Sequence, residues 1–238
     1  MSKLKIGSLT VEIVRKNIKN LHLAVYPPNG RVRVAVPLRV DNEALRLAVA
    51  SRIAWIRRQQ KKFLTQDRQS RREFVQRESH YYLGRRYFLN VIIQDGPARV
   101  IVNSKPVIDF YIPSDANRLR RERILQEWYR KELKTLIPPL IKKWEDIIGI
   151  HVDNWGVKKM KTKWGTCNTR DRRIWINLEL AKKPIHCVEY IIVHEMVHLL
   201  ERKHNERFVD YMDKFLPRWR TLRDQLNRFP LRHENWDY

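Results

Sequence analysis

The sequence predicts an α+β protein, in which a β-rich N-terminal part and a long helix precede a C-terminal part built around one apolar helix. Alternating apolar and polar residues recur through residues 1–113, as strands with one buried face require. One long helical pattern covers residues 114–149. Residues 150–238 combine a hairpin pattern with three helical patterns. We therefore expect three consecutive parts with these boundaries.

The N-terminal part begins with three alternating segments that we expect to be strands: residues 10–16, 21–27 and 31–37. The sequence Pro-Pro-Asn-Gly supplies a turn signal between the last two segments. Asp41 or Asn42 is then expected to cap a single helix over residues 43–64, because apolar residues recur there at helical spacing. The polar and basic stretch 65–78 fits either a loop or an extension of this helix.

A second group of strands follows. Residues 80–93 predict a hairpin that turns near Gly84, and the segments 98–103 and 107–113 continue the β pattern. Ser114 or Asp115 is expected to start the long helix, which runs to about residue 148. The pair Pro138-Pro139 should kink or divide that helix, because proline lacks the backbone N–H that helical hydrogen bonding needs.

In the C-terminal part, residues 157–164 and 173–180 alternate around a turn signal and predict a β-hairpin. Three helices should follow. Pro184 lies near the first turn of the first helix, Asn205 caps the second, and Pro217 opens the third, which ends before Pro230.

The composition limits the possible classes of protein. The chain has 49 Lys and Arg against 26 Asp and Glu, a net charge of +23, and such a charge attracts polyanions, most often nucleic acid. The same charge fits a solvated basic surface without a specific partner. No apolar run reaches the roughly 18 to 20 residues of a membrane span, and no signal peptide is evident. With only two cysteines, we expect a cytoplasmic protein that does not contact a membrane.

The segment "YIIVHEMVHLLERKH", residues 190–204, contains the candidate metal-binding and catalytic residues. His194 and His198 are four residues apart, so on a helix both imidazoles leave the same face and can bind one metal ion. Glu195 lies about 100° away around the helix, where it can reach a water molecule near the metal. This spacing predicts two ligands and a general base for metal-assisted hydrolysis.

A catalytic zinc site needs a third protein ligand. His204, five residues after His198, can serve if the helix ends and the chain turns back. Glu201 is the alternative, but on an unbroken helix it would lie almost in line with both histidines, so we favour His204. One zinc ion per chain is expected. Glu189, Glu201 and Asp210 remain open as hydrogen-bond partners of the histidines.

The segment "KWGTC", residues 163–167, lies on the predicted hairpin just before its turn. Its backbone could pair with an extended peptide, with Trp164 as a wall of the cleft and Gly165 and Thr166 beside it. A purely structural role fits the same residues. Cys167 has two possible roles: it is either a small buried residue that packs like an apolar one, or a part of the substrate site.

These motifs, in the order "KTKWGTC", "RIWINLEL", "PIHCVEYIIVHEMVHLLERKHNERF" and Pro217, resemble the YgjP-like metal-dependent hydrolases, which are grouped with zinc metallopeptidases and related to the SprT-like and WLM-type proteases. The resemblance covers the whole chain. It implies a zincin-like catalytic part, zinc ligands at His194, His198 and His204, and Glu195 as the base. The chain departs from the family at Thr166, where serine is usual, and at Val209, where tryptophan is usual.

The leading hypothesis is therefore a zinc metallopeptidase that cleaves proteins or peptides. The related proteases act on proteins bound to DNA, so substrates associated with nucleic acid are a further expectation. A metal-dependent hydrolase of phosphoanhydrides, such as a UTP pyrophosphatase, is the alternative, although no Gly-rich phosphate loop is present. A non-enzymatic nucleic-acid binder with structural zinc is less favoured, because structural zinc sites usually have four protein ligands. The sequence predicts no oligomeric state.

Overall fold

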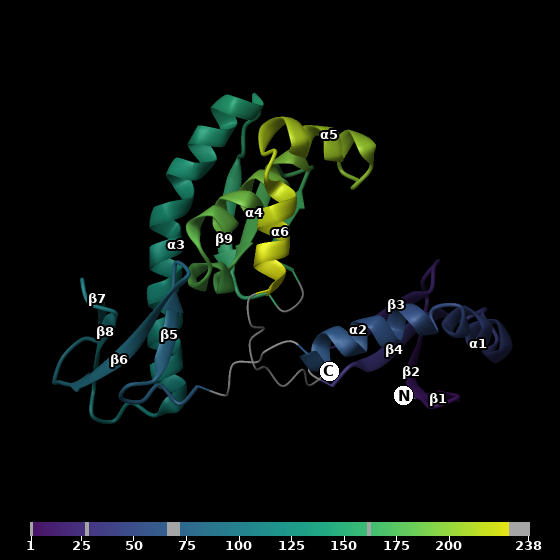
Figure 1. Ribbon diagram of the computed structural model, residues 1–238, viewed down its shortest axis with the longest axis horizontal. Coiled ribbons are helices and arrows are strands. Elements are labelled where there is room, and N and C mark those ends of the chain that lie inside the picture. The colour runs from purple at the N-terminus through teal and green to yellow at the C-terminus, as the bar shows by residue number, and fades with distance from the viewer. Residues whose placement is uncertain (1, 27–28, 66–71, 161–162, 229–238) are drawn as a thin grey trace. The chain divides into compact units, whose positions relative to one another are not determined.

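The computed structural model describes residues 2–26, 29–65, 72–160 and 163–228 (Figure 1). Six α-helices and three β-sheets occur within these residues, so the predicted α+β class is confirmed. The described chain forms two compact units, which we call the N-terminal unit (residues 2–65) and the C-terminal unit (residues 72–228). The boundary therefore falls before the second group of strands, whereas the sequence had suggested a boundary at residue 113.

The N-terminal unit contains a four-stranded sheet in the order β1-β2-β4-β3, in which β2 and β4 are parallel and the other pairs antiparallel. Its strands are β1 (Ser2–Ile6), β2 (Leu9–Lys16), β3 (His22–Tyr26) and β4 (Arg31–Pro37). The three predicted strands are confirmed, and β1 is additional. Val32, Val34 and Val36 alternate into the core, where they meet Leu45 and Ile56 from the helices.

Two helices, α1 (Asn42–Ala50) and α2 (Ile53–Thr65), replace the single helix predicted here. Asp41 caps α1 as predicted, since its side chain accepts a hydrogen bond from the backbone N–H of Ala44. At the break, Ser51 Oγ and Arg52 Nη1 both donate to the carbonyl of Ala48. Side-chain bonds of this kind compete with the helical ladder, and they mark where it is interrupted.

The C-terminal unit begins with a sheet in the order β5-β6-β8-β7, which confirms the predicted hairpin and the two strands after it. The strands are β5 (Ser79–Tyr82), β6 (Arg85–Ile93), β7 (Arg99–Val102) and β8 (Val107–Ile112). Gly84 has a φ of +81° in the hairpin turn, a conformation that favours glycine. The stretch 66–71 lies outside the described residues, and residues 72–76 form no regular element.

The helix α3 (Arg118–Ile148) runs without interruption through Pro138 and Pro139, so the expectation that they divide it was wrong. Asn117 caps it, three residues later than the earlier of the two predicted starts. Both prolines are exposed, so water can bond to the carbonyls that lose their helical partners. The buried residues Ile137 and Ile141 hold the helix against the core on either side.

The third sheet, in the order β10-β11-β9, contains a hairpin at the predicted turn, but the segment 157–164 predicted as its first strand was wrong. Residues 161 and 162 of that segment lie outside the described residues. The strands of this sheet are β9 (Asn154–Lys158), β10 (Gly165–Asn168) and β11 (Arg173–Asn177). The hairpin pairs β10 with β11, whereas β9 runs parallel to β11 on its other side. Residues 178–182 form a 3-10 helix, η1 (Leu178–Lys182), instead of continuing the strand.

Three helices complete the C-terminal unit: α4 (Ile185–Val197), α5 (Glu206–Phe215) and α6 (Trp219–Arg228). The helix α4 occupies the centre, packed against β10, β11, α3, α5 and α6 (Figure 1). The hairpin β5–β6 docks next to the start of α4, because Leu83 and Gly84 donate backbone hydrogen bonds to the carbonyls of Ala181 and Lys182. This contact explains why the second sheet belongs to the same unit as α4.

Within the described residues, no helix combines the length and the apolar character that crossing a membrane would require.

Candidate active site

The helix α4 is apolar on almost every side, and nine of its thirteen residues are buried. Such a helix must lie inside the core. His194 lies in its last turn, and His198 caps its C-terminal end. Because the two are one turn apart, their rings face each other edge-on, with centroids 5.0 Å apart.

The chain turns back directly after His198 and brings His204 to the other two histidines. Leu199 and Leu200 donate to the carbonyls of Met196 and Val197, and these tight bonds end the helix. Asn205 then caps α5 by accepting a hydrogen bond from the backbone N–H of Phe208, as predicted. The expected helix break is thus present, and it places His204 next to His194 and His198.

Glu201 lies in this turn, and its side chain accepts a hydrogen bond from the backbone N–H of Lys203. Its backbone carbonyl lies 3.1 Å from Nδ1 of His198. An N–H at Nδ1 donating to that carbonyl leaves Nε2 of His198 with a free lone pair, the arrangement that orients many metal-binding histidines. Glu201 therefore supports His198 through its backbone.

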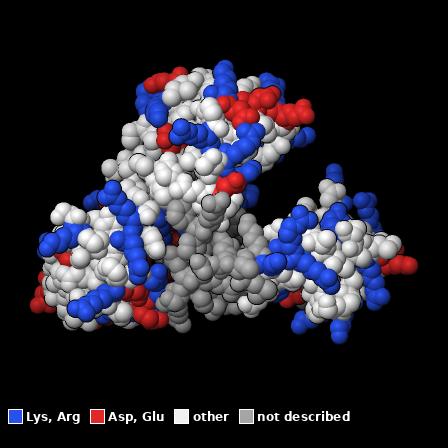
Figure 2. Space-filling view, viewed as in Figure 1, with Lys and Arg blue, Asp and Glu red and all other residues white. Residues whose placement is uncertain are grey.

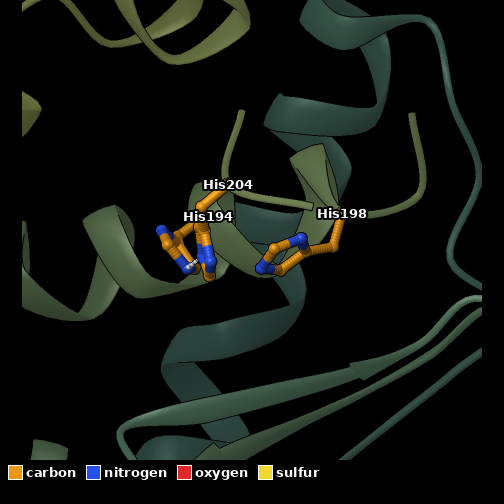
Figure 3. Close-up of side chains that lie close together, drawn as sticks. All are labelled: His194, His198 and His204. Atoms are coloured by element: carbon orange, nitrogen blue, oxygen red, sulfur yellow. Dashed lines mark hydrogen bonds between the residues drawn. The ribbon is translucent and has the colours of Figure 1, made fainter. Parts of the chain in front are cut away.

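His194, His198 and His204 place their ring nitrogens around one small volume (Figure 3). One ligand nitrogen from each residue lies within 4.8 Å of the others, and Nε2 of His194 is 3.1 Å from Nε2 of His204. Within the described part of the chain, these are the His, Cys, Asp or Glu side chains that come close enough together, in a group of at least three, to hold a metal ion.

Phe208, from the first turn of α5, contacts all three histidines. Its ring centroid lies 5.0, 4.8 and 4.7 Å from those of His194, His198 and His204, and its side chain is buried. No sequence pattern suggests this role, since an apolar residue at a helical core position normally packs against other apolar residues. The cluster is thus held by an aromatic side chain from a second helix.

Glu195 is only 5 % exposed, and its carboxyl group lies directly against the backbone of Gly165 on β10. A Cβ atom at position 165 would come within 2.5 Å of Oε1 of Glu195, which is closer than atoms can approach. Burial raises the pKa of Glu195 to about 8, while the nearby ammonium group of Lys163 acts to lower it. A carboxyl group with a raised pKa accepts protons more readily than an exposed one.

Burial, together with charge repulsion from His198 and His204, lowers the pKa of His194 to about 3. Burial also lowers the pKa of His198. Both rings are therefore neutral near pH 7. Neutral imidazole is the form that binds metal ions.

A pocket of about 670 Å³ opens onto the three histidines and Glu195. The predicted residues Trp164, Gly165 and Thr166 line it, together with Cys167. The strand β10 is at the edge of its sheet within the described residues, so this edge borders the pocket.

The sequence indicated no role for six other residues that line the pocket: Lys163, Asn168, Thr169, Tyr190, Ile191 and Arg202. The spacing of Tyr190, one helical turn before His194, could have indicated it. Lys163 and Arg202 lie in a strand connection and in a turn, where no periodicity marks the direction of a side chain.

The remaining candidates have other roles. Glu189 accepts hydrogen bonds from Lys143 and Trp144 of α3 and so ties two helices together. Asp210 is exposed on α5, and no described hydrogen bond joins it to the histidines. Burial raises the pKa of Cys167 to about 11, with Glu195 adding to the effect, so this free thiol is neutral and a poor nucleophile.

A family profile described as "YgjP-like, metallopeptidase domain" matches residues 19–229. No curated protein matches the chain. Among solved structures, the metallopeptidase zymogen abylysin of Pyrococcus abyssi aligns at 19 % identity over 37 % of this chain and 89 % of its own, with a TM-score of 0.35. That score is too low to bear on the function.

The family match spans most of both units and includes β10, α4 and the turn to His204. The chain belongs to the YgjP-like metallopeptidase-domain family.

Proposed function

We propose that this protein is a zinc-dependent peptidase, in which His194, His198 and His204 bind one zinc ion and Glu195 is the general base. The observation that carries the proposal is the convergence of three imidazoles beside a buried carboxyl group in one open pocket. Three protein ligands with an accessible fourth side are typical of catalytic zinc.

The donor set fits zinc. Zn–N bonds of about 2.0 to 2.1 Å in a tetrahedral site put the ligand nitrogens about 3.3 Å apart. The separation of 3.1 Å between Nε2 of His194 and Nε2 of His204 is close to that value. Neutral imidazoles without carboxylates also suit zinc better than magnesium or calcium, which prefer oxygen ligands.

A bound zinc ion would lower the pKa of a water molecule and polarise the substrate carbonyl. Glu195 would take the proton from the attacking water and deliver it to the leaving amine. Its burial against Gly165, where no Cβ atom competes for the space, restricts the positions open to its carboxyl group, which saves the entropy of positioning it during the reaction.

The edge strand β10 offers a place for the substrate. An extended peptide can add to a sheet edge through backbone hydrogen bonds. Trp164, Gly165 and Thr166 would then lie along the substrate, next to Glu195. Lys163 and Arg202 add positive charge to the same pocket, which favours acidic substrate residues.

Lys163 and Arg202 also suit a phosphate-containing substrate, so hydrolysis of a nucleoside triphosphate is the alternative function. Against it, the described residues contain no carboxylate cluster that could hold the magnesium ion such substrates usually bring. The net positive charge of the chain is compatible with protein substrates that are bound to nucleic acid.

The experiment is cleavage of a loosely folded protein by the zinc-loaded full chain beside its Glu195→Gln variant, with UTP hydrolysis measured in parallel. Proteolysis lost in the variant, with zinc content unchanged, supports the proposal. UTP hydrolysis that depends on Glu195, without proteolysis, would establish the alternative.

A further inference from the structure

Positive charge is concentrated in the N-terminal unit. Residues 2–65 contain fourteen Lys and Arg but only three Asp and Glu, whereas the chain as a whole has 49 and 26. In the view of Figure 2, blue side chains surround this unit and red ones are few. The proposed peptidase site lies entirely in the other unit, so it gives no reason for this excess.

The sheet of the N-terminal unit has one covered and one open face. Residues of the covered face, such as Val11, Val34 and Leu23, pack against α1 and α2. The alternating positions point the other way, and none of them is buried. They are Lys3, Lys5, Thr10, Glu12, Val14, Lys16, His22, Ala24, Tyr26, Arg31, Arg33 and Ala35. We call them the open face.

Cations from neighbouring strands come together on the open face. Lys3 pairs in register with Glu12, which in turn pairs with Arg33, so a cation lies on each side of the one carboxylate. Lys5 lies one pleat further along β1. Neighbouring strands are about 4.8 Å apart, so these groups form a grid on the scale of successive phosphates.

The open face also has an aromatic side chain. Tyr26 pairs with Arg31, whose guanidinium group lies 5.8 Å from the centre of the tyrosine ring. The small residue Ala24 lies two positions before Tyr26 on the same face. A ring beside a guanidinium group on an open sheet provides stacking for a base and charge for its phosphate.

A pocket of about 340 Å³ adjoins one end of this sheet, where the β1–β2 turn meets α2. Its polar lining consists of hydroxyl, amide and guanidinium groups: Ser8, Thr10, Asn29, Arg31, Arg57 and Gln60. No carboxylate is among the described residues that line it. Donors without acceptor-only groups suit an anion such as a phosphate.

We propose that the open face binds single-stranded nucleic acid, with Lys3, Lys5 and Arg33 on phosphates and Tyr26 stacked on a base. This inference does not depend on the peptidase proposal. Because single-stranded nucleic acid offers exposed bases as well as phosphates, it uses both the aromatic and the cationic side chains. An anionic membrane surface would use only the cations.

The test measures binding of a fluorescein-labelled oligothymidylate to the full chain across a salt series. A triple variant carries Lys3→Gln, Lys5→Gln and Arg33→Gln. The matched control removes the same charge from exposed positions of α3 in the other unit, with Lys131→Gln, Lys134→Gln and Lys142→Gln. All six positions are solvent-facing or partly so, and thermal melts check that both variants fold.

We expect the open-face variant to bind at least about tenfold more weakly at about 0.1 M salt, and its slope of log affinity against log salt to fall by about 2, since each phosphate contact contributes about 0.7. The α3 variant should bind the oligothymidylate almost as tightly as the wild type. Tyr26→Leu should weaken oligothymidylate binding by at least about fivefold. It should leave binding to heparin, which has no bases, unchanged.

Equal losses of oligonucleotide affinity in the two triple variants would mean that the positive charge acts wherever it lies on the surface, and would overturn the proposal. So would binding to phosphatidylserine vesicles without binding to the oligonucleotide. If Tyr26→Leu weakened oligonucleotide and heparin binding alike, or neither, the assignment to nucleic acid would be wrong.

Discussion

Two residues without catalytic chemistry of their own, Gly165 and Phe208, decide the geometry of the proposed site. Gly165 leaves the space that the carboxyl group of Glu195 fills, and Phe208 packs against all three histidines. The proposed base and the proposed ligands are thus each held by a neighbour that approaches closely. Displacement of a catalytic group by about 1 Å can cost about a hundredfold in rate.

Gly165→Ala is therefore expected to reduce kcat by about ten- to a hundredfold while zinc content stays unchanged, because the new Cβ atom must displace the side chain of Glu195. Glu195→Ala removes every atom that the new Cβ atom would meet. When Gly165→Ala is added to Glu195→Ala, the cost of Gly165→Ala in the residual steady-state kinetics should be at least about tenfold smaller than in the wild type. Additive losses in the double variant would show that Gly165 does not act through Glu195.

Phe208→Leu should weaken zinc binding by about ten- to a hundredfold, as loss of support for metal-binding histidines typically does. Phe215→Leu is the matched control, because Phe215 lies on the same helix and stacks on Tyr211, away from the histidines. Competition with a fluorescent chelator measures both affinities. Similar losses in the two variants would indicate a general loss of packing in α5.

At this scale, the sequence indicated that His194 and His198 share one face of a helix with Glu195 beside them, because residues four apart on a helix point the same way. It could not indicate Gly165 as the neighbour of Glu195, because that contact joins a strand to a helix about 30 residues away in the chain. The role of Phe208 depends on how α5 packs on α4, which no local pattern specifies.

At the scale of elements, short segments between helices and strands position the larger parts. The turn from His198 to Asn205 was predictable because a cap residue follows a break in the apolar pattern. The parallel pairing of β11 with β9 was not predictable, because alternation defines a strand without defining its partner. The continuity of α3 through two prolines followed from their exposure, which is a tertiary property.

The segment before β5 allows a test of how one side chain positions a stretch of backbone. Glu78 accepts hydrogen bonds from the backbone N–H groups of Glu73 and Phe74, and Phe74 has a φ of +58°. Burial acts to raise the pKa of Glu78, but hydrogen bonds from His80 and these two N–H groups outweigh it and hold the pKa below its usual value. Glu78→Gln should destabilise the segment by about 1 to 3 kcal/mol at pH 7.

Because the pKa of Glu78 is lower in the folded state, its contribution is present above the unfolded pKa and is lost as pH falls through the folded pKa. Hydrogen exchange at the amides of Glu73 and Phe74 should be faster in the variant at neutral pH. The difference between variant and wild type should shrink below about pH 4.3, the usual pKa of glutamate. A difference independent of pH would rule out the charged carboxylate as the cause.

At the scale of the whole molecule, the chain combines a C-terminal unit that holds the proposed metal site with an N-terminal unit that holds much of the positive charge. The sequence predicted the α+β class and most strands and helices, because hydrophobic alternation and caps are local signals. It did not predict that the second sheet belongs with α4. That association depends on contacts such as those of Leu83 and Gly84 with η1.

The central claim is that three histidines hold one metal ion, and elemental analysis of the purified full chain tests it most directly. We predict about one zinc per chain in the wild type, and substantial loss in His194→Ala, His198→Ala and His204→Ala. The control His151→Ala, an exposed histidine outside the cluster, should keep the wild-type content. Wild-type zinc content in all three cluster variants would contradict the account.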